Sequence, residues 1–393
     1  IVLGILGILV YLFFFQSAPQ APTPFAPGTF PPIGEAPAGG EGTASTTPTT
    51  IETVRGETGK GARFRQITKT ATAGYGLLPS KTASSTLRYI ERQSGNIFEF
   101  NGEKSVRLSE TTIPKLYEAV FSASGEGVVA RYYRSSSNSI GALAFLIQKA
   151  TSSEVAEVKP VQAPQGLEDV AFAPKNGTYF YYTSNSIYAQ GFTKDIKTGV
   201  SKNIWQSPLT EWNVSWPTED NIAIASRSAS NVPGFLYFLS PKTGSVTKVL
   251  GNVLGLSSKI SPDGKSLILS KTVDGIIKTS LYTIATGNEI PLAVDTLAEK
   301  CVFDPLVYTI IYCATPEVSP TEKYPDDWYK GVISPNDKLW RLDTVSEESE
   351  VIFNPRVEAQ TEIDMQKLAV KDDGSAIYFI NKRDSTLWEL TIK

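Results

Sequence analysis

The chain has no histidine among its 393 residues, and this absence removes a large part of enzyme chemistry. Histidine is the usual general base near neutral pH and the partner of serine and cysteine nucleophiles, so mechanisms of those kinds are excluded. Metal sites built on imidazole ligands are excluded for the same reason. We therefore predict that the chain carries no cofactor and no bound metal.

Nucleophile and phosphate-binding motifs are also missing. No Gly-x-Ser-x-Gly sequence occurs. Gly264-Lys265-Ser266 resembles the end of a phosphate-binding loop, but Lys259 stands where that loop requires glycine. An excess of positive charge is lacking too, because 37 Lys and Arg face 40 Asp and Glu, for a net charge of −3. A nucleic-acid-binding face requires such an excess, so we expect no nucleic-acid partner.

Cysteine occurs only twice, as Cys301 and Cys313. The pair lies on the first and second strands of a predicted hairpin centred near Val307, so the two residues can face each other across neighbouring strands. Outside the cytoplasm this geometry favours a disulfide. The alternative is two buried free thiols, and two thiols without an imidazole do not suit zinc.

A repeat of about 44 residues runs through most of the chain. At each unit an apolar or aromatic residue precedes a turn signal, and the steps between these anchor residues are 43, 51, 44, 44, 43 and 67. Short strand-like runs at such a period are typical of β-propeller blades. The seven anchors are Leu78, Phe121, Phe172, Trp216, Ile260, Phe303 and Val370.

A second landmark supports four strands in each unit. About 20 residues after most anchors comes a step of Leu or Ile, an aromatic residue, any residue and an apolar residue, as in Leu236-Tyr237-Phe238-Leu239 and Leu387-Trp388-Glu389-Leu390. A Thr-Gly turn follows in three units, and glycine supplies the positive φ that a tight hairpin needs. We therefore predict that each unit contains four strands: an anchor strand, a second strand, a third strand with the aromatic residue, and a fourth strand.

Together with the Ser261-Pro262-Asp263-Gly264 hairpin, this pattern resembles the TolB-like family of WD40-type propeller repeats over residues 62–393. The chain departs from eukaryotic WD40 proteins, because it has no Gly-His or Trp-Asp dipeptide and cannot form their histidine hydrogen-bond network. The resemblance implies a binding or scaffold protein.

The ring is expected to close by joining the two ends of the repeat region. The seventh unit stops one strand short, while Arg63–Thr68 forms an extra strand-like run before the first anchor. Placing this run as the last strand of the seventh blade removes exposed strand edges. The alternative is that residues 63–68 are the end of a linker. We predict an all-β, seven-bladed β-propeller closed by this N-terminal strand.

The N-terminal residues predict an anchor and a tether. Residues 1–15 are almost continuously apolar but short of the ~20 needed to span a bilayer, so we interpret them as an incomplete membrane-anchor helix. The alternative is a cleaved signal peptide. Residues 16–61 are rich in Pro, Ala, Gly and Thr, which predicts a disordered linker. Because no Lys or Arg precedes Arg55, we expect a single-pass protein of the cell membrane with its propeller outside the cytoplasm.

The long last step indicates an insertion within Thr315–Asp337 that combines acidic and aromatic residues. Insertions in repeat proteins project from one face and often bind ligands. The alternative is a self-packed loop that covers the sixth blade. The candidate ligand-binding residues are Tyr324, Asp326, Asp327, Trp328 and Tyr329.

The function predicted from these features is a membrane-tethered, monomeric propeller that is not an enzyme. It would act as a binding or assembly scaffold for a protein or a cell-envelope polysaccharide. One alternative is a carbohydrate-active propeller enzyme, which needs Asp and Glu carboxylates facing a common cavity. Another is a purely structural envelope component.

Overall fold

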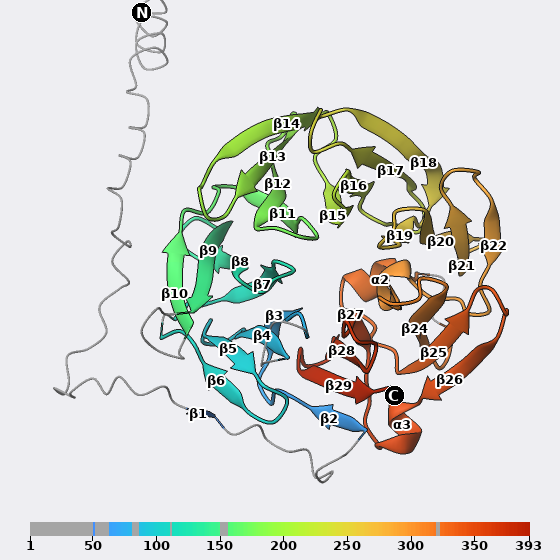
Figure 1. Cartoon of the computed structure of the whole chain (residues 1–393). Helices are drawn as coiled ribbons and strands as arrows, with labels where there is room; N and C mark the ends of the chain where they lie inside the picture. Colours follow the sequence, from blue (N-terminus) through green and yellow to red (C-terminus); the bar gives the residue numbers. More distant parts are fainter. Residues whose placement is uncertain (1–49, 52–62, 81–85, 111, 150–155, 320–322) are drawn as a thin grey trace, which may run out of the picture. The chain divides into compact units, whose positions relative to one another are not determined.

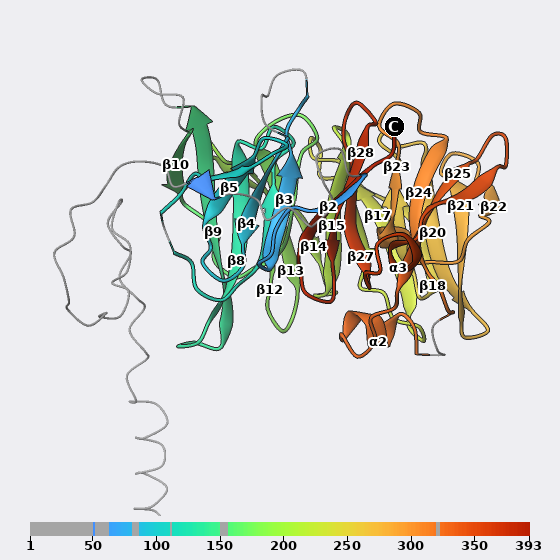
Figure 2. The ribbon, with the colours of Figure 1, turned by 90° about the horizontal axis from the view of Figure 1, so that it is seen from below.

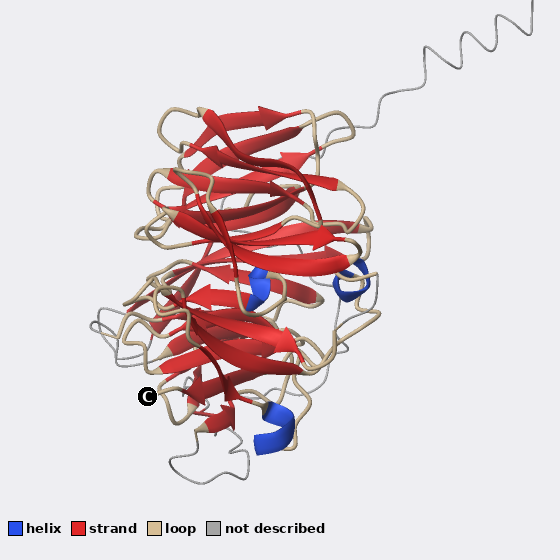
Figure 3. Ribbon diagram, turned by 90° about the vertical axis from the view of Figure 1, so that its right-hand side faces the viewer, coloured by secondary structure: helices blue, strands red, loops and turns tan. Residues whose placement is uncertain are grey.

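The computed structural model describes residues 50–51, 63–80, 86–110, 112–149, 156–319 and 323–393. In these residues seven antiparallel sheets are arranged around a central channel (Figure 1). The prediction of an all-β, seven-bladed propeller is confirmed. Figure 3 shows how little of the described chain is helical.

The strands of the first four blades follow the chain in order. Blade 1 contains β3 (Thr72–Leu77), β4 (Leu87–Glu91), β5 (Ile97–Phe100), β6 (Ser105–Arg107) and the added outer strand β1 (Thr50–Ile51). Blade 2 contains β7 (Leu116–Phe121), β8 (Gly127–Arg134), β9 (Ser139–Lys149) and β10 (Ala156–Val161). Blade 3 contains β11 (Leu167–Phe172), β12 (Thr178–Ser184), β13 (Ala189–Asp195) and β14 (Ser201–Ser207). Blade 4 contains β15 (Trp212–Thr218), β16 (Asn221–Ser226), β17 (Pro233–Leu239) and β18 (Val246–Leu254).

The remaining blades carry the three short helices of the described chain. Blade 5 contains β19 (Ser257–Ile260), β20 (Ser266–Val273), β21 (Ile276–Thr283) and β22 (Glu289–Pro291). Blade 6 contains β23 (Cys301–Phe303), β24 (Ile310–Pro316), β25 (Asp337–Asp343) and β26 (Ser349–Phe353). Blade 7 contains β27 (Met365–Val370), β28 (Ala376–Asn381), β29 (Leu387–Thr391) and β2 (Phe64–Gln66). The helices are the 3-10 turn η1 (Ala298–Lys300), α2 (Asp326–Tyr329) and α3 (Pro355–Glu358).

Six of the seven predicted anchor residues lie at or next to the end of an innermost strand, and Trp216 lies two residues before the end of β15. The strands are buried on both faces because blades pack against neighbours on either side. In β12, Phe180 and Tyr182 join the core shared with blade 4, whereas Tyr179 and Tyr181 join the core shared with blade 2. Since successive strand residues point to opposite faces, an unbroken aromatic run fills both cores.

The ring closes as predicted. Strand β2 pairs antiparallel with β29, with Phe64 opposite Leu390 and Gln66 opposite Trp388. The Phe64 ring stacks on Trp388 with centroids 4.7 Å apart, and Ile67 is 3% exposed in the core between blades 7 and 1. The N-terminal strand therefore supplies both backbone hydrogen bonds and core side chains where the ring closes. We call this pairing of β2 with β29 the seam.

Three arginines reinforce consecutive blade boundaries in the same way. Each pairs with a glutamate of its own blade and donates to a backbone carbonyl of the next blade. The sets are Arg65 with Glu389 and Gly102 O, Arg88 with Glu99 and Gly125 O, and Arg131 with Glu118 and Glu168 O. A guanidinium suits this position because it presents several donors in a fixed plane.

Cys301 and Cys313 are directly opposite each other on β23 and β24 and form a disulfide. Both residues are buried. The predicted bridge is confirmed, and the alternative of two free thiols is wrong.

The predicted anchor at residues 1–15 lies outside the described residues, as does nearly all of the predicted linker at residues 16–61. Thr50 and Ile51 fall within that linker, yet they form β1 and pair with Val106 and Ser105 of β6. This pairing satisfies backbone groups at an otherwise open strand edge. No helix in the described ranges has the length and apolar character needed to cross a membrane.

Candidate functional site

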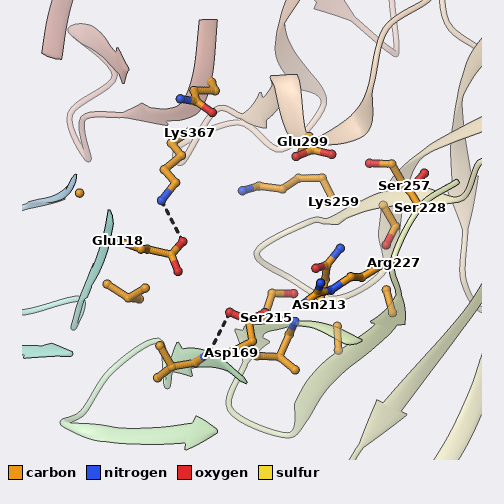
Figure 4. Close-up of a pocket in the computed structure, with 18 of the residues that line it drawn as sticks. Glu118, Asp169, Asn213, Ser215, Arg227, Ser228, Ser257, Lys259, Glu299 and Lys367 are labelled. Atoms are coloured by element: carbon orange, nitrogen blue, oxygen red, sulfur yellow. Dashed lines mark hydrogen bonds and ion pairs between the residues drawn. The ribbon is translucent and has the colours of Figure 1, made fainter. Parts of the chain in front are cut away.

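A cavity of about 870 Å³ occupies the central channel, and all seven blades contribute to its lining. Its size falls within the usual range for small-molecule sites. The helix α2 stands at one end of the propeller, next to this cavity (Figure 2). The charged and hydroxyl-bearing side chains around it are shown in Figure 4.

One wall carries two carboxylates that share a single guanidinium. Glu118 Oε2 accepts a hydrogen bond from Arg131 Nε at 2.8 Å, and Asp169 Oδ1 lies 3.7 Å from an Arg131 terminal nitrogen. Each carboxylate is about one-fifth exposed to the cavity. We call Glu118 and Asp169 the carboxylate pair.

A β-bulge at the same place in neighbouring blades sets the direction of these side chains. The register shifts between Leu116 and Glu118 in β7 and between Leu167 and Asp169 in β11. A bulge turns a side chain away from its regular direction and is common next to active sites. Figure 4 shows the resulting carboxylates directed into the cavity.

Blade 1 has glycine at the corresponding bulge, and this lets the blades approach closely. A Cβ added to Gly74 would lie 1.9 Å from the Ala119 carbonyl oxygen. Without a side chain at Gly74, Lys367 of blade 7 reaches past blade 1 to blade 2. Its Nζ lies 3.0 Å from Glu118 Oε1 (Figure 4).

The surroundings push the pKa values of the two carboxylates apart. Burial by itself raises the pKa of Glu118, but the charges of Lys367 and Arg131 outweigh burial and lower it to about 2. For Asp169, burial and then the charge of Glu118 raise the pKa to about 6, against the opposing effects of Arg131 and the backbone N–H groups of Val214 and Val170. Glu118 is therefore ionised at neutral pH, while Asp169 exchanges its proton close to pH 6.

The other side of the cavity carries two cations, Arg227 after β16 and Lys259 in β19 (Figure 4). Nearby, Glu299 accepts a hydrogen bond from the Tyr329 hydroxyl. Burial raises the pKa of Glu299 and lowers that of Lys259, although water reaches both side chains through the channel. Neutral polar groups complete this side of the lining, namely Asn213, Ser215, Ser228 and Ser257.

Of the residues predicted in the insertion, only Tyr329 lines the cavity. Tyr324 and Trp328 are 3% and 2% exposed, and they form a small core with Ile277 and Leu297. Asp326 accepts a hydrogen bond from the Ser230 backbone N–H at 2.9 Å, which attaches α2 to the loop between β16 and β17. Asp327 is the second residue of α2, and its carbonyl accepts the N–H of Val332. Part of the segment therefore packs against neighbouring residues, while the Tyr329 side chain lines the cavity. Ligand binding by these five residues stays a prediction.

A buried ionic cluster holds the insertion in place. Lys300 Nζ lies 2.7 Å from Asp337 and 2.8 Å from Asp364, and all three side chains are inaccessible to solvent. The Trp328 indole N–H donates to Asp364 at 2.9 Å. Although burial disfavours the charge of Lys300, the two carboxylates raise its pKa, so the cluster is an ion pair with its polar groups satisfied.

The cavity residues were missed in the sequence, yet a signal for them was present. Counting back three positions from an anchor gives Glu118 from Phe121 and Asp169 from Phe172. The same count in the other blades gives Tyr75, Asn213, Ser257, Lys300 and Lys367, all of them polar. All of the seven except Lys300 line the cavity.

No family model matches the chain, and no curated protein matches it in sequence. Its structure is similar to an oligogalacturonate lyase in complex with manganese, with a TM-score of 0.58 and 11% identity over 88% of this chain and 96% of the lyase. An oligogalacturonate lyase from Vibrio parahaemolyticus matches with a TM-score of 0.57 and 8% identity, over 88% and 97% of the two chains. TolB from Acinetobacter baumannii covers 81% of this chain and 63% of its own at a TM-score of 0.41 and 14% identity, which is too low to carry an argument.

These comparisons show a shared propeller fold and no particular repeat family. They also correct the prediction that the chain is not an enzyme. That prediction rested on the scaffold role implied by the repeat, yet two solved propellers that match along nearly their whole length are lyases. The architecture is therefore one that enzymes use.

The first lyase was solved in complex with manganese, so we examined the described part of this chain for residues that could hold a metal ion. Histidine is absent from the sequence, and no group of three or more Asp, Glu or Cys side chains in the described ranges is placed to hold a metal ion. The described cavity residues do not fit such a site.

Proposed function

We propose that the propeller is a carbohydrate-active enzyme that cleaves a glycosidic bond in its central cavity. The observation that carries this proposal is the carboxylate pair, whose pKa values of about 2 and about 6 are set by neighbouring groups. Two carboxylates with separated pKa values on one cavity wall can divide the roles of acid and base between them. The structural similarity to two oligogalacturonate lyases supports a sugar as the substrate class.

The protonation states assign the roles. Asp169 holds a proton up to about pH 6 and donates it to the glycosidic oxygen as the bond to carbon breaks. Glu118 is ionised and takes up one proton, from the attacking water in a hydrolysis or from the sugar in an elimination. One proton is given and one is received, so the total charge of the pair does not change. The starting state returns when Glu118 releases its proton and Asp169 takes one up from the solvent. Arg131 and Lys367 keep Glu118 ionised.

The test is cleavage of a panel of acidic and neutral oligosaccharides by the wild type, Asp169→Asn and Glu118→Gln. Each variant should lower kcat/KM by about 100-fold or more, the usual contribution of a general acid or base. Glu219→Gln is the matched control, because Glu219 lies in an exposed ion pair with Lys175 at the turn after β15. Analysis for unsaturated product ends separates elimination from hydrolysis.

Stability is measured in parallel because Asp169 also joins blades 3 and 4. Its Oδ2 accepts the Val214 N–H at 2.9 Å, and the amide oxygen of asparagine can accept the same hydrogen bond. Melting temperatures close to wild type with lost turnover would support the proposal. Full turnover by both variants, or no cleavage of any sugar by the wild type, would overturn it.

We also propose that the propeller works outside the cytoplasm. The disulfide between Cys301 and Cys313 supports this placement, because such bonds persist in oxidising compartments. Digestion of intact cells with an external protease tests it. If the propeller is degraded only after the cell membrane has been permeabilised, the placement is contradicted.

A further inference from the structure

Two cations in the cavity have no ionic partner in the described residues. Arg227 and Lys259 belong to neighbouring blades, line the cavity and are exposed to it. Among the described side chains, neither takes part in a hydrogen bond or a salt bridge. By contrast, Arg131 and Lys367 in the same cavity are both paired with Glu118. Arg227 and Lys259 therefore lack the direct ion pairs that hold Arg131 and Lys367.

Glu299, on the same side of the cavity, forms no salt bridge with either cation. Glu299 interacts with Lys259 through its charge, but its hydrogen-bond partner is the Tyr329 hydroxyl. Figure 4 shows Arg227 and Lys259 extending into the channel from the side away from Glu118. Within a channel walled by protein, such charges attract an anion more strongly than they would on an open surface.

The division of charge also determines how an anionic ligand would lie. The carboxylate pair repels an acidic group on its own side, while Arg227 and Lys259 attract it on the other. A guanidinium matches the two oxygens of a carboxylate geometrically, and an ammonium beside it adds a compact positive charge. A sugar acid bound in this way places its neutral glycosidic oxygen toward Asp169.

We propose that Arg227 and Lys259 recognise the carboxylate groups of an acidic oligosaccharide, so the substrate class is a uronic-acid sugar. This inference rests on the proposed function for the location of the reacting bond, but the binding it describes does not require turnover. Arg227 and Lys259 thereby become the specificity-determining residues of the cavity.

The test measures binding of one sugar in two charge states. Isothermal titration calorimetry of the full chain is carried out with oligogalacturonate and with the same oligomer converted to its methyl ester, which removes the charge but keeps the sugar ring. We expect the acid form to bind at least tenfold more tightly than the ester. Arg227→Gln and Lys259→Gln should each weaken binding of the acid about tenfold or more, and should leave binding of the ester nearly unchanged.

Lys265→Gln is the matched control, because Lys265 lies in the exposed turn after β19, in the same blade as Lys259, and does not line the cavity. Its affinity for the acid form should equal that of the wild type. Equal binding of acid and ester, or unchanged affinity in Arg227→Gln, would overturn the inference, as would absence of binding by either form. If binding follows the expected pattern and the bond is never cleaved, the inference stands and the proposed enzyme function fails.

Discussion

Lys367 of blade 7 lies with its Nζ 3.0 Å from Oε1 of Glu118 in blade 2, past the glycine-containing strand of blade 1. This ion pair joins non-adjacent blades and helps to set the charge of the cavity wall. Removing this ion pair should therefore change the pKa of Glu118 while the propeller stays folded.

The variant Lys367→Met should raise the pKa of Glu118 from about 2, while Arg131 still holds it below the ordinary value. In the wild type the pKa of Glu118 is lower in the folded state than in the unfolded chain. Its contribution to stability is therefore complete above the unfolded pKa and is lost as pH falls toward 2. The variant should lose less stability over that acidic range. Carboxyl NMR titration measures the pKa, and Lys371→Met, which removes an ion pair with Asp373 instead, should leave it unchanged.

For Asp169 the dependence of stability on pH has the opposite sign. Its pKa of about 6 lies above that of an unfolded aspartate, so ionising it in the folded protein costs stability as pH rises toward and through 6. The proposed acid role predicts that kcat/KM falls as pH rises past about 6. Asp169→Asn should remove both effects, so its stability relative to wild type should increase over this range. A pH–rate profile that is flat between pH 5 and 8 would contradict the role of Asp169.

Substitution of Trp328 should lower the stability of the fold and substitution of Tyr329 should not, although the two residues are neighbours in α2. Trp328→Phe removes the N–H donor to buried Asp364 and should cost about 1–3 kcal/mol of unfolding free energy. Tyr329→Phe removes the hydrogen bond to Glu299 at the cavity and should change the unfolding free energy by about 0.5 kcal/mol or less. Chemical denaturation of the two variants makes the comparison. Equal destabilisation would show that α2 is not held by the buried cluster.

Two truncations test the seam between β2 and β29. A chain that begins at residue 61 keeps β2 and should remain folded. One that begins at residue 71 loses Phe64 and Ile67, unpairs β29 and exposes a strand edge. The second deletion should cost several kcal/mol, comparable with the whole stability of a domain, and should cause aggregation. Equal melting temperatures would mean that the ring does not depend on β2.

The sequence predicted the blades well because the information for them is periodic. An anchor residue recurs in each unit and the aromatic step in most of them, so an error in a single unit does not shift the register. The seam was predictable because the seventh unit lacked a strand that Arg63–Thr68 could supply. The disulfide followed from the positions of Cys301 and Cys313 in one hairpin.

The site was harder to predict because its chemistry depends on contacts between blades. The aromatic and acidic insertion suggested a ligand loop, yet Trp328 is buried and donates a hydrogen bond to Asp364, which lies 36 positions later in the chain. The pKa of Glu118 depends on Lys367, 249 positions away. Polar character three positions before each anchor was visible in the sequence. The sequence did not show which of those residues share a cation, because residues of different blades come together only in the closed ring.

The seam also has a consequence for synthesis. Arg65 in β2 and its partner Glu389 in β29 are 324 positions apart, so the first strand of the ring is made long before its neighbour. At the usual rate of translation the wait is roughly 15–65 s. During this time Phe64 has no blade 7 core to enter and Ile67 has only the blade 1 half of its core, so the growing protein is an arc rather than a ring. The propeller can become a closed channel only when nearly its last residue has been added.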